Sequence, residues 1–279
     1  MALVFTAAVM WSTAGLFVRL LDLDVWTILA WRSLFAAASL AVIAGLRHRG
    51  AALSGLLASG PVGLLAIALS TVSIGGYVIS LKLTSVANVM VIYATVPLIT
   101  AGIAWLWMRE RIDRRVLVAS VIALCGVAVM AGTQTRMLDL AGNAVALIMT
   151  LAFGMQLVMA RRYRTLDMGP VNAVGALLVA LLCLPLMQHD LPGTRDLVVL
   201  ALFGITTTSV AYSLFMIGGR YIPSGEAGLI GMIDVVLAPF WVWLLFAEDP
   251  GAAALLGGAL VLAATGYYLW GQRRKAAVD

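Results

Sequence analysis

Residues 85–112 read SVANVMVIYATVPLITAGIAWLWMRERI, and residues 224–250 read SGEAGLIGMIDVVLAPFWVWLLFAEDP. Both stretches contain small residues, a proline, a tryptophan and a closing glutamate, and a shift of 138 residues aligns Trp105 with Trp243. The two prolines miss this register by four residues. Each stretch is long enough to cross a bilayer, so the likeness indicates a repeat unit of five helices. An odd number of crossings turns the second copy upside down, as in inverted-repeat membrane proteins.

The composition agrees with a membrane location. Hydrophobic residues make up 63% of the 279 residues, and charged residues make up 11%. Soluble proteins carry about 25% charged residues, because they must cover their outside with polar groups. We therefore expect lipid around this fold. Cys125 and Cys183 both lie in apolar runs, so we expect buried thiols, with no disulfide and no metal site.

Charges, prolines and polar clusters divide the chain into ten apolar spans. The predicted spans are 2–20, 26–46, 56–80, 86–108, 116–133, 141–160, 171–188, 196–218, 225–246 and 252–271. Ten spans of about 20 residues leave only short connections, with no room for a soluble domain. The first span has no basic stretch before it and is too long for a signal peptide. The sequence therefore predicts an all-α integral membrane protein of ten transmembrane helices. We expect two inverted five-helix repeats, at residues 1–136 and 137–279.

The basic residues predict the orientation. One set of connections and the C-terminal tail carry thirteen of the 18 Lys and Arg residues, the opposite set carries four, and Arg32 lies inside the second span. Because Lys and Arg are retained on the cytoplasmic side, we expect a plasma (inner) membrane protein with both termini in the cytoplasm. The net charge of +5 is then explained by topology and by contact with anionic lipids, and no nucleic-acid partner is expected.

Several function classes lack their signature residues. A nucleotide-binding loop needs Lys followed by Ser or Thr, and neither Lys82 nor Lys275 is. The two histidines, His48 and His189, fall at opposite sides of the predicted membrane, which argues against metal catalysis and against a Ser-His pair. We therefore expect no enzyme, no cofactor and no metal. A channel or a flippase stays open as an alternative, although inverted repeats with proline-interrupted helices favour alternating access.

Charged residues inside the spans are the first candidates for a binding site, since each costs at least about 2.5–3.5 kcal/mol in the membrane. Asp234 lies about ten residues into the ninth span and suits a substrate ammonium or a proton, or else a packing hydrogen bond. Glu226 is adequately explained by the helix dipole. Arg32 has three interpretations: a snorkelling side chain, a structural bond to a carbonyl, or a partner for a substrate carboxylate.

Polar and aromatic stripes on the third and eighth spans are equivalent under the five-helix repeat and suggest a shared cavity. Packing of small polar residues is the alternative. The candidate substrate-binding residues are Trp11, Ser12, Ser73, Tyr77, Asn88, Tyr93, Gln156, Ser209, Tyr212 and Asp234. Gly75, Gly76, Pro97 and Pro239 are the candidate gating or helix-breaking residues. Aromatic residues near span boundaries, Trp241 and Tyr268 among them, are expected to anchor at the membrane interface.

Three motifs resemble a known family. They are WSTAGLF at 11–17, WRSLFAAASL at 31–40 with its Arg32, and Pro97 followed thirteen residues later by Glu110 in MRERI. With the helix count and charge bias, the chain resembles the EamA-type transporters of the drug/metabolite transporter superfamily. Val235 stands where the second half would match Pro97.

The resemblance implies a secondary carrier that exports small metabolites. The WST motif is most similar to bacterial amino-acid exporters, including the aromatic amino-acid group. A multidrug or cationic-toxin exporter is the alternative that the resemblance leaves open. The predicted partners are a small-molecule substrate and the lipid bilayer. The oligomeric state stays open, and a monomer is sufficient.

Overall fold

The structure is a computed structural model that describes residues 1–48, 56, 59–84, 86–131, 140–187, 191–246 and 251–276. Within these residues every regular element is a helix. The first half contains α1 (Ala2–Ser12), α2 (Ala14–Arg19), α3 (Val25–His48), α5 (Gly60–Leu83), α6 (Val86–Tyr93), α7 (Val96–Met108) and α8 (Arg114–Ala131). The second half contains α9 (Leu140–Arg162), α10 (Met168–Cys183), η2 (Leu184–Leu186), α11 (Thr194–Phe203), η3 (Gly204–Ala211), α12 (Tyr212–Gly219), α13 (Ser224–Gly231), α14 (Ile233–Phe246) and α15 (Gly251–Ala276).

These elements make ten successive helical segments at the predicted positions, which confirms the predicted fold class. Nine segments of the described chain are long and apolar enough to cross a membrane. The tenth is α8, which is 18 residues long and carries only its two initial arginines as charges. The all-helical architecture follows from the solvent, because backbone groups in lipid must find their hydrogen bonds inside the segment.

Four of the ten segments are irregular. The first is divided at Thr13 between α1 and α2, the fourth at Ala94 and Thr95 between α6 and α7, and the ninth at Met232 between α13 and α14. The eighth contains the π-helical turn η3 between α11 and α12. Pro97 lies in the first turn of α7, where its missing N–H costs nothing. The fourth and ninth segments, which the repeat makes equivalent, are therefore both discontinuous.

Two of the expected helix breaks are not found. α5 continues through Gly75 and Gly76 to Leu83. The reason is packing, since a Cβ at Gly76 would lie 2.9 Å from the Cβ of Met149, so this glycine lets α5 and α9 approach closely. In the ninth segment, α14 runs through Pro239, and the break lies seven residues earlier. A proline removes one backbone hydrogen bond, and α14 tolerates that loss.

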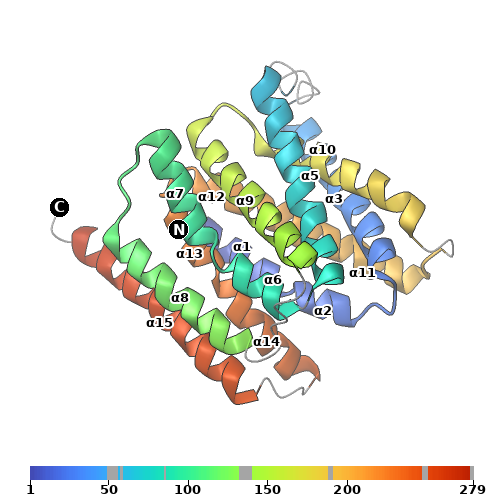
Figure 1. The fold of residues 1–279 in the computed structure, drawn as a ribbon. Coiled ribbons are helices and arrows are strands. Elements are labelled where there is room, and N and C mark those ends of the chain that lie inside the picture. Colours follow the sequence, from blue (N-terminus) through green and yellow to red (C-terminus); the bar gives the residue numbers. More distant parts are fainter. Residues whose placement is uncertain are drawn as a thin grey trace.

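The two halves share one core. Figure 1 shows α1 near the centre of the bundle, while α8 and α15 lie side by side along one edge. The largest buried cluster combines Ala8 of α1 with Leu157 of α9, Phe215 of α12 and Ala227 of α13. α1 thus packs mainly against helices of the second half, and residues at its end reach the interface between the halves.

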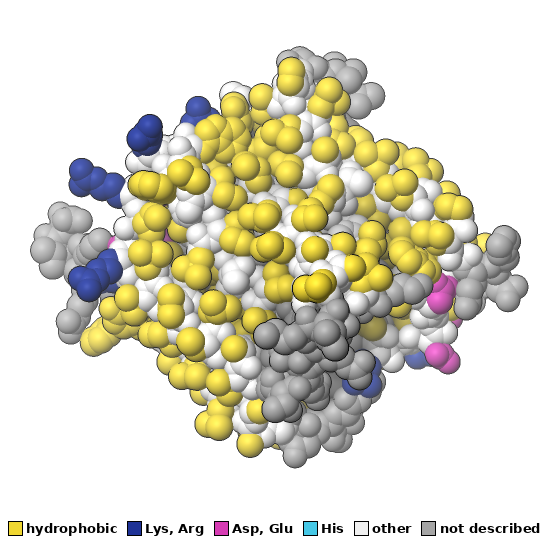
Figure 2. All heavy atoms as spheres, in the orientation of Figure 1, with side chains coloured by type: hydrophobic (Ala, Val, Ile, Leu, Met, Phe, Trp, Pro, Cys, Tyr) yellow, Lys and Arg dark blue, Asp and Glu magenta, His cyan; other side chains and the backbone are white. Residues whose placement is uncertain are grey.

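The surface is apolar around its middle and charged at its two ends. On the face drawn in Figure 2, hydrophobic side chains cover the centre, most Lys and Arg gather where α7 and α9 end, and Asp and Glu gather at the opposite end. Leu46, Leu64, Leu106 and Leu182 are each at least 65% exposed, which suits lipid and not water. We call one end of the bundle the basic end, because it carries Arg109, Arg111, Arg114, Arg115, Arg161, Arg162, Arg164 and Arg220.

Candidate functional site

Trp11 joins the end of α1 to the second half of the chain. Its indole N–H donates to the backbone oxygen of Thr207 at 2.7 Å. Its ring lies 4.7 Å from the ring of Phe215 and 5.9 Å from that of Phe153 in centroid distance. Tyr93 extends this aromatic cluster, with its ring 6.1 Å from Phe153. Residues from four separate membrane segments therefore meet in one aromatic cluster.

The π-helical turn η3 provides the backbone acceptors for this arrangement. Besides Trp11, the side-chain nitrogen of Asn172 donates to the Thr208 oxygen at 3.2 Å. A π turn departs from the regular i to i−4 hydrogen-bond pattern and is frequent at functional sites. Gly204 begins the turn and lies against α3, where a Cβ would come within 2.3 Å of the Arg32 backbone oxygen. Side chains from α1 and α10 thus hold the turn close to α3.

A buried polar network connects the third, sixth, seventh and eighth segments. The Tyr212 hydroxyl donates to the side-chain oxygen of Gln156, and the Gln156 nitrogen donates to the Ala66 oxygen at 3.4 Å. The Ser70 hydroxyl donates to the Asn172 side-chain oxygen at 2.8 Å. Ser70, Gln156 and Asn172 are fully buried. Gln156 and Tyr212 thus bond to each other in this state. Satisfied buried polar groups of this kind rigidify a core.

Asp234 is the charged group of the site. It is the second residue of α14, directly after the break at Met232, and its side chain is half-buried. The helix N-terminus favours a carboxylate there. Its Oδ1 has no hydrogen-bond partner among the described residues. Asp234 lies close enough to Tyr77 and Tyr93 to interact electrostatically with both. A carboxylate with one unpartnered oxygen in this environment is suited to bind a cation or a proton.

Arg32 lies on another side of the same region. It interacts electrostatically with Tyr77, and its guanidinium lies 4.9 Å above the ring of Phe203. Its Nε has no hydrogen-bond partner within the described chain. Tyr77 therefore has Asp234 and Arg32, two charges of opposite sign, in its surroundings.

The other predicted site residues have mixed surroundings. Ser12 already has two partners, since it donates to the Val9 oxygen at 2.6 Å and accepts from the Trp241 indole at 2.8 Å. Ser209 is buried with its hydroxyl oxygen unpartnered among the described residues, and Ser73 is half-buried. The side chain of Asn88 lies outside the described residues.

Two aromatic residues expected to anchor at the membrane interface have partners inside the protein. Tyr268 is fully buried between α15 and α8, and Trp241 binds Ser12 in the interior. Asn172, which has two partners in the network, was not among the predicted site residues. A lone Asn in an otherwise apolar span is a signal that could have identified it. Within the described chain, no three His, Cys, Asp or Glu side chains cluster closely enough to hold a metal ion.

The organisation of the chain into two five-helix halves is matched by a protein family. The EamA-like transporter family matches residues 1–132 and 140–270, one match in each half. The chain belongs to the EamA-like transporter family. This EamA-like protein is therefore a multi-pass membrane transporter of small molecules.

The structural comparison agrees with this fold. A solved structure described only as a crystal structure of a protein is similar to this EamA-like transporter with a TM-score of 0.84. The two chains are 19% identical, and the match covers 98% of this chain and 97% of the other. No protein of curated function matches the chain. The structural likeness concerns the fold alone.

Proposed function

We propose that this EamA-like transporter is a secondary carrier that exports small metabolites, amino acids above all, by alternating access. The observation that carries the proposal is the Asp234 carboxylate at the break between α13 and α14, near Tyr77 and Tyr93, whose Oδ1 has no hydrogen-bond partner among the described residues. A carboxylate in an apolar surrounding binds a cation strongly, because little water competes for it. The α-ammonium of an amino acid is such a cation.

The aromatic cluster suits the part of the substrate that lies beyond its ammonium group. The rings of Trp11, Tyr93, Phe153 and Phe215 lie with centroids 4.7 to 6.1 Å apart. Trp11, Tyr93 and Asp234 are only partly buried, so each retains surface for contact with a ligand. Aromatic rings stack on aromatic or aliphatic groups, and a cationic group is also attracted to their faces. A small amphipathic substrate with an ammonium group matches both features.

The helix interruptions support alternating access. Discontinuous segments at corresponding positions of two repeats mark the binding site in many secondary transporters. Here the fourth and ninth segments are both interrupted, and Tyr93 and Asp234 lie beside the two interruptions. Motion of one half against the other would expose these residues to each side in turn. The excess of arginines at the basic end supports the proposal that this end, with both termini, faces the cytoplasm.

Counterflow in proteoliposomes tests the proposal. Vesicles are loaded with one unlabelled amino acid at a time, and the entry of a labelled amino acid is followed without any ion gradient. We expect saturable exchange that depends on the loaded amino acid. Absence of exchange with every amino acid, in protein that melts cooperatively, would contradict the amino-acid assignment.

The competing assignment is an exporter of cationic drugs, because Asp234 would also bind a cation that lacks a carboxylate. Competition separates the two assignments. Amino acids inhibit the exchange if they share the site, whereas a drug exporter would be inhibited by hydrophobic cations and not by amino acids.

A further inference from the structure

Two contacts join the halves of the protein at the basic end. The Arg161 guanidinium lies 2.7 Å from the Glu110 carboxylate. The neighbouring Arg162 donates to the backbone oxygen of Trp107 at 3.1 Å, and its guanidinium lies 5.3 Å from the Trp107 ring. Trp107 lies at the end of α7 and Glu110 follows that end in the first half, and both arginines belong to the end of α9 in the second half. The ends of α7 and α9 are thus held together by charge and by ring contact.

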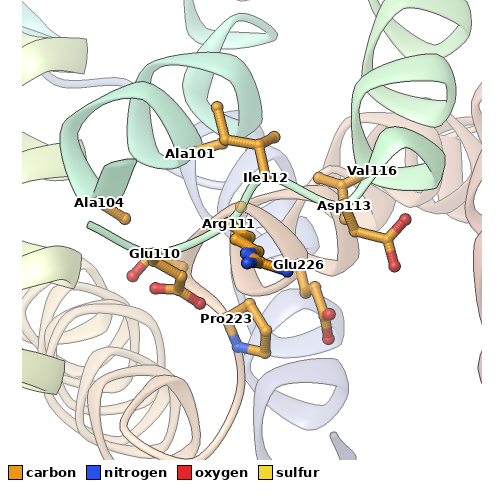
Figure 3. A pocket seen from close by; sticks show the side chains of 11 residues that line it. Ala101, Ala104, Glu110, Arg111, Ile112, Asp113, Val116, Pro223 and Glu226 are labelled. Atoms are coloured by element: carbon orange, nitrogen blue, oxygen red, sulfur yellow. The ribbon is translucent and has the colours of Figure 1, made fainter. Parts of the chain in front are cut away.

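A small pocket lies beside this junction, between the end of α7 and the start of α13. Its cavity volume is about 40 Å³, and Glu110, Arg111 and Glu226 line it with their charged side chains (Figure 3). Since one water molecule needs about 10–15 Å³ of such space, the pocket holds a few waters and no metabolite. The basic end is closed at this point.

Close helix packing completes the closure. α13 lies against α7 through glycines, and a Cβ at Gly228 would lie 3.0 Å from the Cα of Pro97. A Cβ at Gly225 would lie 3.0 Å from the Cβ of Ala101. α7, which continues from the helix break beside Tyr93, is therefore in contact with both α9 and α13 at the basic end.

We propose that the Glu110–Arg161 ion pair, supported by the contact of Arg162 with Trp107, is a latch that closes the transport path at the basic end. The inference rests on the proposed alternating-access cycle and assigns this structure to the state closed at that end. The exposed fractions of the two side chains are 20% for Glu110 and 21% for Arg161. A fully buried ion pair costs about 3–5 kcal/mol to break, and a fully exposed one contributes about 0–1 kcal/mol. A partly exposed pair holds the closed state and still dissociates during a cycle.

The pocket is also lined by the carboxylates of Asp113 and Glu226. Asp113 accepts from the Arg115 backbone N–H at 2.8 Å and so caps the start of α8. Glu226 interacts with the buried Tyr268 and also lies close enough to Arg161 and Glu110 to interact electrostatically with both. Glu110 pairs with Arg161 of the other half of the protein, which is what a latch requires.

Cysteine labelling tests the latch without any substrate. Cys125 and Cys183 are replaced by Ala, and Ser224, a buried residue of the pocket, is replaced by Cys as the reporter. A membrane-impermeant maleimide is added from the side of the basic end. With Glu110→Gln or Arg161→Gln we expect the labelling rate to rise about fivefold, the effect of losing roughly 1 kcal/mol from the closed state.

Two controls decide the interpretation. Arg114→Gln removes an exposed arginine at the same end and is expected to leave the labelling rate unchanged. The exchanged pair, Glu110→Arg with Arg161→Glu, is expected to return the labelling rate toward that of the reporter protein with the original pair. Equal rates for Glu110→Gln and Arg114→Gln, or an exchanged pair that labels as fast as the single variants, would overturn the latch. The labelling assay needs no amino acid. If the labelling rates change as expected but no amino acid is exchanged, only the proposed substrate is disproved. If amino acids are exchanged but the labelling rates do not change, only the latch is disproved.

Discussion

Replacement of Gly204 by Ala tests how η3 is positioned against α3. The added Cβ would lie 2.3 Å from the Arg32 backbone oxygen and 3.1 Å from the Ala36 nitrogen. Both atoms belong to helical backbone, which cannot rotate away as a side chain would. Because a carbon and a carbonyl oxygen approach to about 3.3 Å at closest, the turn must move by about 1 Å.

The expected cost follows from two opposing effects. Overpacking of a tight interface costs about 1–3 kcal/mol, and at this distance we expect the upper end of that range. Ala gains about 1 kcal/mol over Gly from helix propensity. The net loss is about 2 kcal/mol, which corresponds to a melting temperature lower by roughly 4–8 °C in the purified protein.

Gly102→Ala is the matched control for this variant. Gly102 lies in α7, and a Cβ there would have no atom within 4 Å. We expect this control to melt at or slightly above the temperature of the unchanged protein. A Gly204→Ala protein that melts with the Gly102→Ala control would refute the close packing of η3 on α3.

Two further substitutions test individual hydrogen bonds of the site. Trp11→Phe keeps an aromatic ring but removes the donor to the Thr207 oxygen, so we expect a stability loss of about 1 kcal/mol in thermal unfolding, together with slower counterflow. Unchanged melting would show that this bond contributes nothing. Tyr212→Phe and Gln156→Leu, made singly and together, should show a coupling energy of about 1 kcal/mol in unfolding, because the two side chains bond to each other. Strictly additive effects would contradict that bond.

The segments of the fold were predictable because bilayer thickness sets their length. The span predicted at 26–46 corresponds to α3 at Val25–His48, and the span predicted at 116–133 corresponds to α8 at Arg114–Ala131. Charges and prolines mark the ends of such segments directly in the sequence. Long apolar runs therefore locate the helices to within a few residues at most ends.

The interruptions were less predictable because packing decides where they fall. No proline marks the break at Met232. The preceding Gly231 is packed against Phe215, with a Cβ position 3.2 Å from its ring, so the course of α13 depends on a residue of α12. Conversely, Gly76 is a locally flexible residue that close packing against Met149 keeps in a regular helix.

The orientation of residues around each helix was also hidden from the sequence. α15 is apolar on nearly all sides, so the sequence does not show that Tyr268 lies in a buried cluster with residues of α8 and α13. Trp241 and Ser12 are 229 residues apart, and only the folded chain brings them together. Asp234 was recognisable because a carboxylate inside an apolar span is costly and therefore needs a reason.

The most direct test of the central claim is amino-acid counterflow by the Asp234→Asn protein, with Asp22→Asn as control because Asp22 is an exposed acid at the opposite end of the bundle. Loss of a charged hydrogen bond to a substrate ammonium corresponds to about 1.5–3 kcal/mol, or roughly a 10- to 100-fold higher half-saturation concentration. We expect that increase for Asp234→Asn and unchanged exchange for Asp22→Asn. Normal exchange by a correctly inserted Asp234→Asn protein would contradict the assignment of the substrate site.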